Sequence, residues 1–318
     1  MYSAKGDASS ATSALRIGAH LSINKGYESL TNVLQELEAT TAQLFFKSPQ
    51  ASKAWKKVLD PSSSDIINAK KNIASRGYFI ISHSQYTLNF TRTLAPKYQW
   101  QLGSLINDLE NCTILGMYGT VIHCGSNVEN KNDKDMYASV ASYIKKAIAT
   151  VPGTAKVIIE IQALSGTHVI GTIDHIKTLL MLMSSAEIER IGVCIDTQHA
   201  SVNGSVFRDK KTVQEYFAEF EKKLGIERLS CIHFNDAKSF TKDCHEDILY
   251  GLIWDKGLGG SPEGLVELLR YCTKKNIPMI LETPAEHAPY DRQIAVSKLL
   301  AGATDKAVDM IVSEYLLQ

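Results

Sequence analysis

Short apolar runs recur along the chain from Arg16 onward, and longer amphipathic segments separate them. The runs cover residues 17–21, 42–46, 78–83, 120–124, 157–161, 191–196, 229–234 and 278–283. The intervening segments have helical spacing and cover residues 26–40, 64–76, 96–115, 136–149, 171–184, 212–224 and 264–275, with a helical tail from Tyr290. Strands that are apolar throughout are typical of a parallel sheet with helices on both faces. Eight strand-then-helix units therefore predict an α/β fold, a closed (β/α)8 TIM barrel, with an open doubly wound sheet as the alternative.

The chain of 318 residues is long enough for one large barrel or two ordinary domains. No linker, low-complexity tract or block of charge divides it. We therefore expect a single barrel domain over residues 16–318. Residues 1–15 are small and polar and have no apolar core region, which excludes a secretory signal and predicts a flexible N-terminal tail.

Composition describes a globular protein with an ample core, because 44% of the residues are hydrophobic and 21% are charged. Lysine plus arginine equals aspartate plus glutamate, 34 against 34, so net charge alone indicates no nucleic-acid partner, although a neutral total can hide one basic face. No apolar run has the length of a membrane span. The six cysteines lack C-x-x-C spacing, which predicts buried, reduced thiols in an intracellular protein of the cytoplasm or nucleus.

After the first strand, six of the predicted strands carry a histidine or an acidic residue at or next to their last position, namely His83, His123, Glu160, Asp196, His233 and Glu282. One such strand indicates little, since a strand-end histidine is more often a hydrogen-bonded structural group than a ligand. The loops that follow barrel strands form one active face, so six such ends predict polar side chains that converge on one rim. A buried carboxylate needs a partner that offsets its desolvation, and a metal ion is the natural occupant of such a site.

Two spaced pairs, Asp196 with His199 and Asp243 with His245, extend this set. It then holds five imidazoles and four carboxylates: His83, His123, Glu160, Asp196, His199, His233, Asp243, His245 and Glu282. Such ligands suit zinc or manganese, and the missing thiolates argue against a structural cysteine-rich zinc site. At three to four ligands per ion, the set suits two or three ions. Two ions about 4 Å apart can clamp both oxygens of an in-line displacement at phosphorus, which favours phosphoester hydrolysis.

The remaining polar candidates are given structural interpretations. His20 ends the first strand, and we expect it to orient a ligand by hydrogen bonding rather than to bind metal. His168, His175 and His287 have no acidic neighbour at a strand end and are assigned to the surface. The glycine-rich segment 257–260 lacks the Lys-Ser/Thr of a phosphate-binding loop and is expected to be a turn. No Ser-His-Asp or Cys-His arrangement points to covalent catalysis.

Seven motifs then occur in a fixed order: IGAHLS at 17–22, HSQYTLN at 83–89, IHCGS at 122–126, GVCIDTQHA at 192–200, HFNDAKS at 233–239, DCHED at 243–247 and ILETP at 280–284. Together they resemble the endonuclease IV family of apurinic/apyrimidinic (AP) endonucleases. The resemblance implies a TIM barrel with three zinc ions that cuts double-stranded DNA on the 5′ side of an abasic site and leaves a 3′-hydroxyl. It also implies activity on 3′-blocked ends, as a 3′-phosphodiesterase or 3′-5′ exonuclease. We expect a monomer that does not bind membranes.

The resemblance also distributes the nine candidates. His83 and His123 would hold one zinc, with Glu160 bridging to a second. The second would be held by Asp196, His233 and Glu282. The third, for which manganese is the alternative metal, would be held by His199, Asp243 and His245. Glu160 and Glu282 are the carboxylates assigned to catalysis.

Departures from the family pattern concern DNA contacts. Tyr86 matches an aromatic residue that reaches into DNA at the lesion, but Thr87 stands where a bulky apolar neighbour is common. Gln50 replaces a frequent arginine, and Lys53 lies close to it in the sequence, as do lysines at 47, 56 and 57. The resemblance thus implies DNA contacts at Tyr86, Thr87, Gln50 and Lys53. We expect the wedge at the lesion to be weaker than in typical members.

Three further departures are the segment IQAL at 161–164 in place of an Asn-Thr-Ala-Gly-like turn, Cys244 in place of an arginine, and residues 250–254 in place of a glycine-rich turn. Members encoded by large DNA viruses show similar departures, so a viral origin, and with it a place in the virion, is a further hypothesis.

Two other functions remain open from the sequence. Metal-dependent sugar isomerases and epimerases use the same barrel and the same rim, with fewer metal ligands and with an acid/base pair for proton transfer. A damaged-DNA binding protein without turnover would also fit the altered DNA loops.

Overall fold

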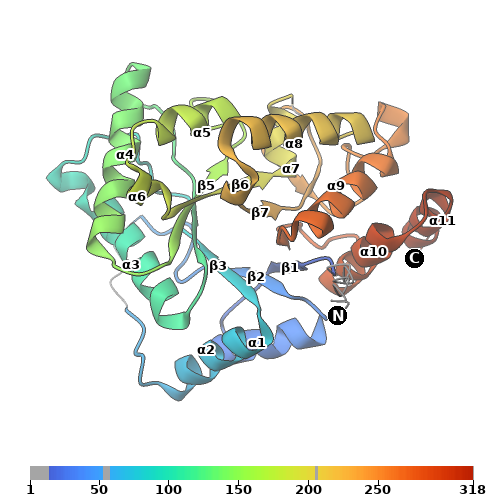
Figure 1. Ribbon diagram of the computed structural model, residues 1–318, viewed down its shortest axis with the longest axis horizontal. Coiled ribbons are helices and arrows are strands. Elements are labelled where there is room, and N and C mark those ends of the chain that lie inside the picture. Colours follow the sequence, from blue (N-terminus) through green and yellow to red (C-terminus); the bar gives the residue numbers. More distant parts are fainter. Residues whose placement is uncertain (1–13, 53–57, 205–206, 318) are drawn as a thin grey trace, which may run out of the picture.

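The computed structural model describes residues 14–52, 58–204 and 207–317. Within them, eight parallel strands close into a barrel in the order β1-β2-β3-β4-β5-β6-β7-β10, with β10 paired to β1 (Figure 1). The strands are β1 (Ile17–His20), β2 (Thr41–Leu44), β3 (Phe79–His83), β4 (Gly119–Ile122), β5 (Lys156–Ile161), β6 (Ile191–Asp196), β7 (Leu229–His233) and β10 (Met279–Leu281). Each overlaps a predicted strand, and the predicted (β/α)8 barrel is confirmed.

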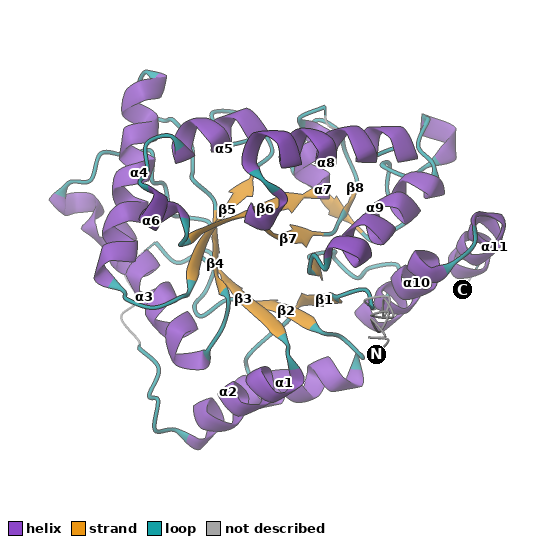
Figure 2. Ribbon diagram, viewed as in Figure 1, coloured by secondary structure: helices purple, strands orange, loops and turns teal. Residues whose placement is uncertain are grey.

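Helices surround the strands as an outer layer (Figure 2). The α-helices of the described residues are α1 (Tyr27–Glu36), α2 (Ser64–Arg76), α3 (Gln99–Leu115), α4 (Asp133–Thr150), α5 (Ile173–Leu180), α6 (Ser185–Ile188), α7 (Thr197–Val202), α8 (Lys210–Leu224), α9 (Pro262–Lys275), α10 (Tyr290–Gly302) and α11 (Asp305–Leu316). The predicted tail from Tyr290 is thus two helices. Gly77 ends α2 in the left-handed conformation at φ 63°, which reverses the chain directly into β3.

Apolar side chains fill the space inside the strands as well as the layer between strands and helices. The inner cluster comprises Phe79, Ile81, Val121, Ile158, Cys194, Cys231 and Ile280. The barrel is therefore a packed core rather than a pore, and polar chemistry is confined to its ends. All the cysteines are free, and only Cys244 is not fully buried.

Two small elements at the carboxyl end of the barrel were not predicted. A loop was expected after Asp196, but the short helix α7 follows, because the Asp196 side chain accepts the backbone N–H groups of Gln198 and His199 and caps it. After β7 the chain forms an antiparallel hairpin of β8 (Asp236–Ala237) and β9 (His245–Glu246). Both elements carry candidate ligands.

The predicted tail, residues 1–15, lies mostly outside the described residues. Ala14 is exposed, whereas Leu15 is buried in the core. The tail and the single-domain assignment therefore stay predictions. Among the described residues, no helix has the length and apolar character needed to cross a membrane.

Candidate metal centre

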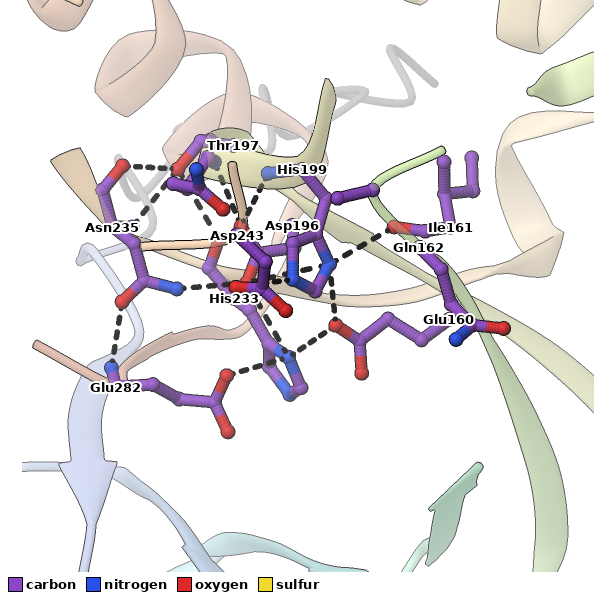
Figure 3. Close-up of polar contacts among 12 residues, drawn as sticks. Glu160, Ile161, Gln162, Asp196, Thr197, His199, His233, Asn235, Asp243 and Glu282 are labelled. Atoms are coloured by element: carbon purple, nitrogen blue, oxygen red, sulfur yellow. Dashed lines mark hydrogen bonds and ion pairs between the residues drawn. The ribbon is translucent and has the colours of Figure 1, made fainter. Parts of the chain in front are cut away.

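The nine candidate ligands meet at the carboxyl end of the barrel. Six stand at or directly after the ends of β3, β4, β5, β6, β7 and β10, and His199, Asp243 and His245 come from α7 and the β8–β9 hairpin. Figure 3 shows several of them around one centre, with Glu160, His233, Asp196 and Glu282 directed toward one another. The nine side chains, which come from positions between His83 and Glu282, therefore share one cage. The cage lies over the packed interior of the barrel.

Glu160 links the first two ligand groups. Its Oε2 lies 3.2 Å from Nε2 of His83 and 3.1 Å from Nε2 of His123. Its other oxygen, Oε1, lies 3.4 Å from Nδ1 of His233 and 3.0 Å from Nδ1 of His199. Because the two oxygens face different histidines, this carboxylate has the placement of a bridge between two cations.

The second group lies on adjacent strands at the centre of the cage. Nδ1 of His233 is 3.0 Å from Oε2 of Glu282 and 4.0 Å from Oδ2 of Asp196. Donor atoms of Glu160, Asp196, His233 and Glu282 all lie within 4.8 Å of one another. One ion could therefore contact all four side chains without a change of backbone.

The third group depends on the two unpredicted elements. Because Asp196 caps α7, His199 stands in its first turn, with Nε2 3.3 Å from Oδ1 of Asp243. Nε2 of His245 lies 3.7 Å from the same Asp243 oxygen and 3.4 Å from Oδ2 of Asp196. Asp243 is the most exposed of the nine, with 43% of its side chain accessible. This group therefore forms the solvent-facing edge of the cage.

The imidazoles are oriented by hydrogen bonds on the side away from the cage. His83 donates from Nδ1 to the carbonyl oxygen of the next residue at 2.7 Å, and His245 donates from Nδ1 to the carbonyl oxygen of Glu282 at 3.2 Å. Nε2 of His233 lies 2.8 Å from the side-chain oxygen of Gln43. In each ring the second nitrogen faces the carboxylates, which is the arrangement of metal-binding histidines.

Several cage atoms lack the hydrogen bonds that burial requires. Oε1 of Glu160, Nδ1 of His233 and Nε2 of His245 are buried without a hydrogen-bond partner of acceptable geometry. Buried polar atoms are nearly always paired, and these belong to the donor types that zinc binds. The residues present therefore fit a metal ion, and they fit it at the junction of all three groups.

The electrostatics of the cage point the same way. Burial opposes ionisation of Glu160, but His123 and its other histidine neighbours outweigh burial and hold the pKa of Glu160 well below its usual value. Burial also opposes the charge of His199, yet Asp196 and nearby carboxylates raise the pKa of His199 well above its usual value. The pKa of His233 is likewise raised despite burial. Without a cation the cage thus keeps protons, which a bound metal ion would displace.

Two orienting residues were missed from the sequence. Gln43, on β2, contacts Glu282 and His233 through its side chain, and its Nε2 lies 3.0 Å from Nδ1 of His20. His20 is itself 3.8 Å from Glu282, in the orienting position expected for it. Asn235 donates to Asp196. Gln43 could have been noticed in the sequence, because it is a polar residue inside the otherwise buried strand TAQL.

Comparison with known proteins supports one family. The family profile described as "Xylose isomerase-like TIM barrel" matches residues 32–302. A relative from Acanthamoeba polyphaga mimivirus named endonuclease 4 is 31% identical over 283 residues, covering 85% of this chain and 86% of the relative. A Campylobacter hominis relative, also named endonuclease 4, is 31% identical over 277 residues, covering 84% and 92%. The chain belongs to the endonuclease IV family of hydrolases.

Solved structures agree in fold. The crystal structure of endonuclease IV from Thermus thermophilus superposes with a TM-score of 0.72 at 24% identity, covering 90% of this chain and 98% of that one. A D-tagatose 3-epimerase-like protein gives a TM-score of 0.64 at 14% identity, covering 94% and 99%. The barrel is thus shared between the endonuclease IV family and sugar epimerases, and it does not by itself separate them.

In this endonuclease IV family member, the loops that carry the expected DNA contacts after β2 and β3 are tied together. Tyr86 N–H donates to the carbonyl oxygen of Pro49 at 3.0 Å, and the Thr87 hydroxyl donates to that of Ala51. Tyr86 is 45% exposed, and its ring centroid lies 5.2 Å from that of His83. Gln50 is exposed between these contacts. Lys53 lies outside the described residues, and all four DNA contacts stay predictions.

Gln162 explains one departure from the family pattern. Its side-chain oxygen accepts the backbone N–H groups of Cys124 at 3.0 Å and Gly125 at 3.3 Å. Gly125 has a φ of 98°, and a Cβ there would lie 2.4 Å from the Asn89 side chain. Gln162 therefore fixes the tight loop that follows His123.

The remaining histidines lie away from the cage. His287 is exposed, as expected, and stacks on Tyr250 with centroids 4.9 Å apart. His168 and His175 were also assigned to the surface, but their side chains are partly buried and hydrogen-bonded to backbone groups. Residues 256–258 form one turn of 3-10 helix, and Gly259 follows in the left-handed conformation, in line with the expected turn.

Proposed function

We propose that the chain is a zinc-dependent AP endonuclease of base excision repair. It would hydrolyse the phosphodiester on the 5′ side of an abasic site in double-stranded DNA and leave a 3′-hydroxyl. Activity on 3′-blocked ends, as a 3′-phosphodiesterase or 3′-5′ exonuclease, belongs to the same proposal, as does a monomeric state. Family membership and the ligand geometry support this function over the others that the barrel allows.

The observation that carries the proposal is the overlap of three ligand groups. His83, His123 and Glu160 form the first, and Glu160 is shared with the second. Asp196 is in turn shared between the second group and the group of His199 and His245. At about three to four ligands per ion, this set supports three zinc ions, with manganese as the alternative at the third position.

Zinc, when bound, supplies Lewis-acid chemistry: it lowers the pKa of water and offsets the negative charge that develops at phosphorus. The protein's own residues supply position. Glu160 places one oxygen in each of two ligand groups, and Glu282 is held by Gln43 on one side and by His233 on the other. The cage walls are buried, which excludes bulk water and strengthens electrostatic interactions within it.

The two alternatives are less well supported. A sugar epimerase needs an acid/base pair but no third metal group, and the convergence of His199, Asp243 and His245 has no use in that reaction. A binding protein without turnover would not need nine side chains of ligand type in one cage. Neither alternative is favoured by a specific observation.

One experiment separates the three functions. A duplex with a single tetrahydrofuran site is incubated with the protein, with and without a chelator. We expect incision on the 5′ side of the lesion that the chelator abolishes and added zinc restores. Binding without incision would support the binding protein instead, and inertness toward DNA would support the epimerase.

A matched pair of variants tests the site itself. His245→Ala removes a ligand candidate, and we expect incision to fall at least a hundredfold. His287→Ala removes an exposed histidine that lies outside the nine candidates, and it should leave incision unchanged. Equal effects of the two substitutions would contradict the assignment.

A further inference from the structure

Two cysteines lie directly beneath the metal centre, inside the barrel. Cys194 on β6 and Cys231 on β7 are partners in the register of the two strands, and both are fully buried in the inner cluster. Cys194 stands two positions before Asp196, and Cys231 stands two positions before His233. Because side chains two positions apart lie on the same face of a strand, both thiols point into the barrel below the cage. We call them the thiol pair.

The thiol pair and His233 bring three donor atoms together. The two Sγ atoms and one ring nitrogen of His233 lie within 4.8 Å of one another. Nδ1 of the same ring is buried without a hydrogen-bond partner. Metal–thiolate bonds of about 2.3 Å place two sulfurs up to about 4.6 Å apart on opposite sides of one ion. The three donors therefore lie close enough to share an ion.

Buried cysteines usually act as small apolar residues, and a thiol in a core is by itself no sign of a ligand. The thiol pair differs from the other cysteines in its company. Among the residues that the structure describes, no other cysteine belongs to a group of three or more side chains able to hold a metal ion. Cys272 is equally buried, on α9, and lies outside every such group.

The donor types select the kind of ion. Imidazole nitrogen and carboxylate oxygen, which make up the cage, suit zinc and manganese. Thiolate is a soft ligand that selects copper(I) and similar ions, and copper(I) is satisfied by two or three ligands where a structural zinc ion requires four. The metal centre thus has a floor whose ligand preference differs from that of its walls. An ion would reach this floor through the solvent-facing edge of the cage at Asp243.

We propose that the thiol pair and His233 form a site for one soft, thiophilic ion of the copper(I) class. Each thiol releases its proton to solvent, and the ion forms one bond to each sulfur and one to the imidazole nitrogen, with no change of oxidation state. His233 is thereby drawn out of the ligand group that it forms with Glu160, Asp196 and Glu282. The soft ion therefore displaces a zinc ion and inhibits the protein.

Competition for copper(I) tests the site. Zinc-loaded protein is titrated without oxygen with copper(I) held by a chromophoric chelator, and transfer is followed by the loss of the chelator's colour. A metallochromic indicator measures the zinc released. We expect about one copper(I) bound per chain and about one zinc released. The double variant Cys194→Ala with Cys231→Ala should bind copper(I) at least about a hundredfold more weakly, because lost ligands cost more than the orienting residues around them.

Cys272→Ala is the matched control, since it removes a buried thiol that has no donor group around it. It should bind copper(I) like the unmodified protein. Without copper, both variants should keep the zinc content of the unmodified protein, because the nine candidate ligands are intact. Thermal unfolding checks that both fold, and the double variant with serine at the two positions, which preserves side-chain size, replaces the alanine variant if that one does not.

Cys244→Ser tests the competing explanation, because Cys244 is the least buried thiol and adjoins two candidate ligands. It should retain copper(I) binding. If Cys244→Ser loses copper(I), if the double variant binds it like Cys272→Ala, or if copper(I) binds without releasing zinc, the proposal is overturned. These outcomes leave the proposed function intact. If the thiol pair binds copper(I) but the protein does not incise the tetrahydrofuran duplex, the soft-ion site stands and the proposed function fails.

Discussion

The side-chain amide of Asn235 donates to Oδ2 of Asp196 over 2.8 Å and ties the end of β7 to the end of β6. The oxygen of the same amide accepts the backbone N–H of Glu282 at 3.0 Å. One buried side chain thus holds the carboxylate of Asp196 and the backbone of Glu282, two cage residues from the strands on either side of β7.

Asn235→Ala should therefore loosen metal binding without removing a ligand. Outer residues that orient metal ligands typically contribute a factor of about 10 to 100 in metal affinity, and we expect a loss of that size. Zinc retained after dialysis against a weak chelator measures it. Asn72→Ala is the control, since that amide donates to Thr31 between outer helices. Retention equal to that of the unmodified protein would show that Asn235 does not position the cage.

Metal removal should make stability depend on pH through His245. Burial opposes its charge, but Asp196 outweighs burial and raises the pKa of His245 to about 9 in the metal-free protein. The unfolded value is about 6.5. Because the folded pKa is the higher one, this stabilisation is fully present below about pH 6.5 and is lost as the pH rises through about 9. It is on the order of 3 kcal/mol.

Urea unfolding of chelator-treated protein at about pH 6 and about pH 9.5 measures this loss. His245→Gln should remove the contribution of this histidine and flatten the pH dependence accordingly. In the zinc-loaded protein the imidazole is not protonated, so stability should not fall over the same range. Identical pH profiles for metal-free unmodified protein and His245→Gln would contradict the prediction.

Thr87→Leu should strengthen binding to abasic DNA if the wedge is weak in this chain. The substitution adds the bulky apolar side chain that the resemblance leads us to expect, but it removes the hydrogen bond to Ala51, which is worth about 1 kcal/mol. Thr87→Val removes the same hydrogen bond without adding bulk, so the difference between the two variants isolates the wedge. If Thr87→Leu and Thr87→Val had the same affinity and turnover, the proposal of a weak wedge at Thr87 would be wrong.

Lys47 lies close in the sequence to Lys53, which is expected to contact DNA, but the Lys47 side chain is buried. Its Nζ lies 3.0 Å from Asp108 and 2.8 Å from the hydroxyl of Ser104. Lys47→Met would leave Asp108 buried and unpaired, which typically costs about 3–5 kcal/mol of unfolding free energy. Replacing both partners, in Lys47→Met with Asp108→Leu, should recover most of it. Denaturant unfolding checks both, and a single variant as stable as the unmodified protein would contradict the account.

The strands and most of the cage could be predicted for one physical reason. A parallel strand covered on both faces has a continuous apolar sequence, so a histidine or carboxylate at its end, such as His83 or Glu160, stands out. The barrel then brings these ends to one rim. His199 could be named as a candidate for its spacing from Asp196, although the helix that presents it was not foreseen.

What the sequence could not predict depends on contacts between distant segments. The hairpin of β8 and β9 has two-residue strands, too short for any periodic pattern. Gln43 acts inside a strand, where its polar character has meaning only once Glu282 and His233 are known to face it.

Zinc content per chain is the most direct test of the central claim, that nine side chains form one cage for metal ions. Protein purified without added metal is analysed by mass spectrometry, beside a variant that combines Asp243→Asn with His245→Gln. The ligand groups predict about three zinc ions per chain, and about one fewer in the variant. Less than one zinc per chain, or the same zinc content in the variant as in the unmodified protein, would contradict the account.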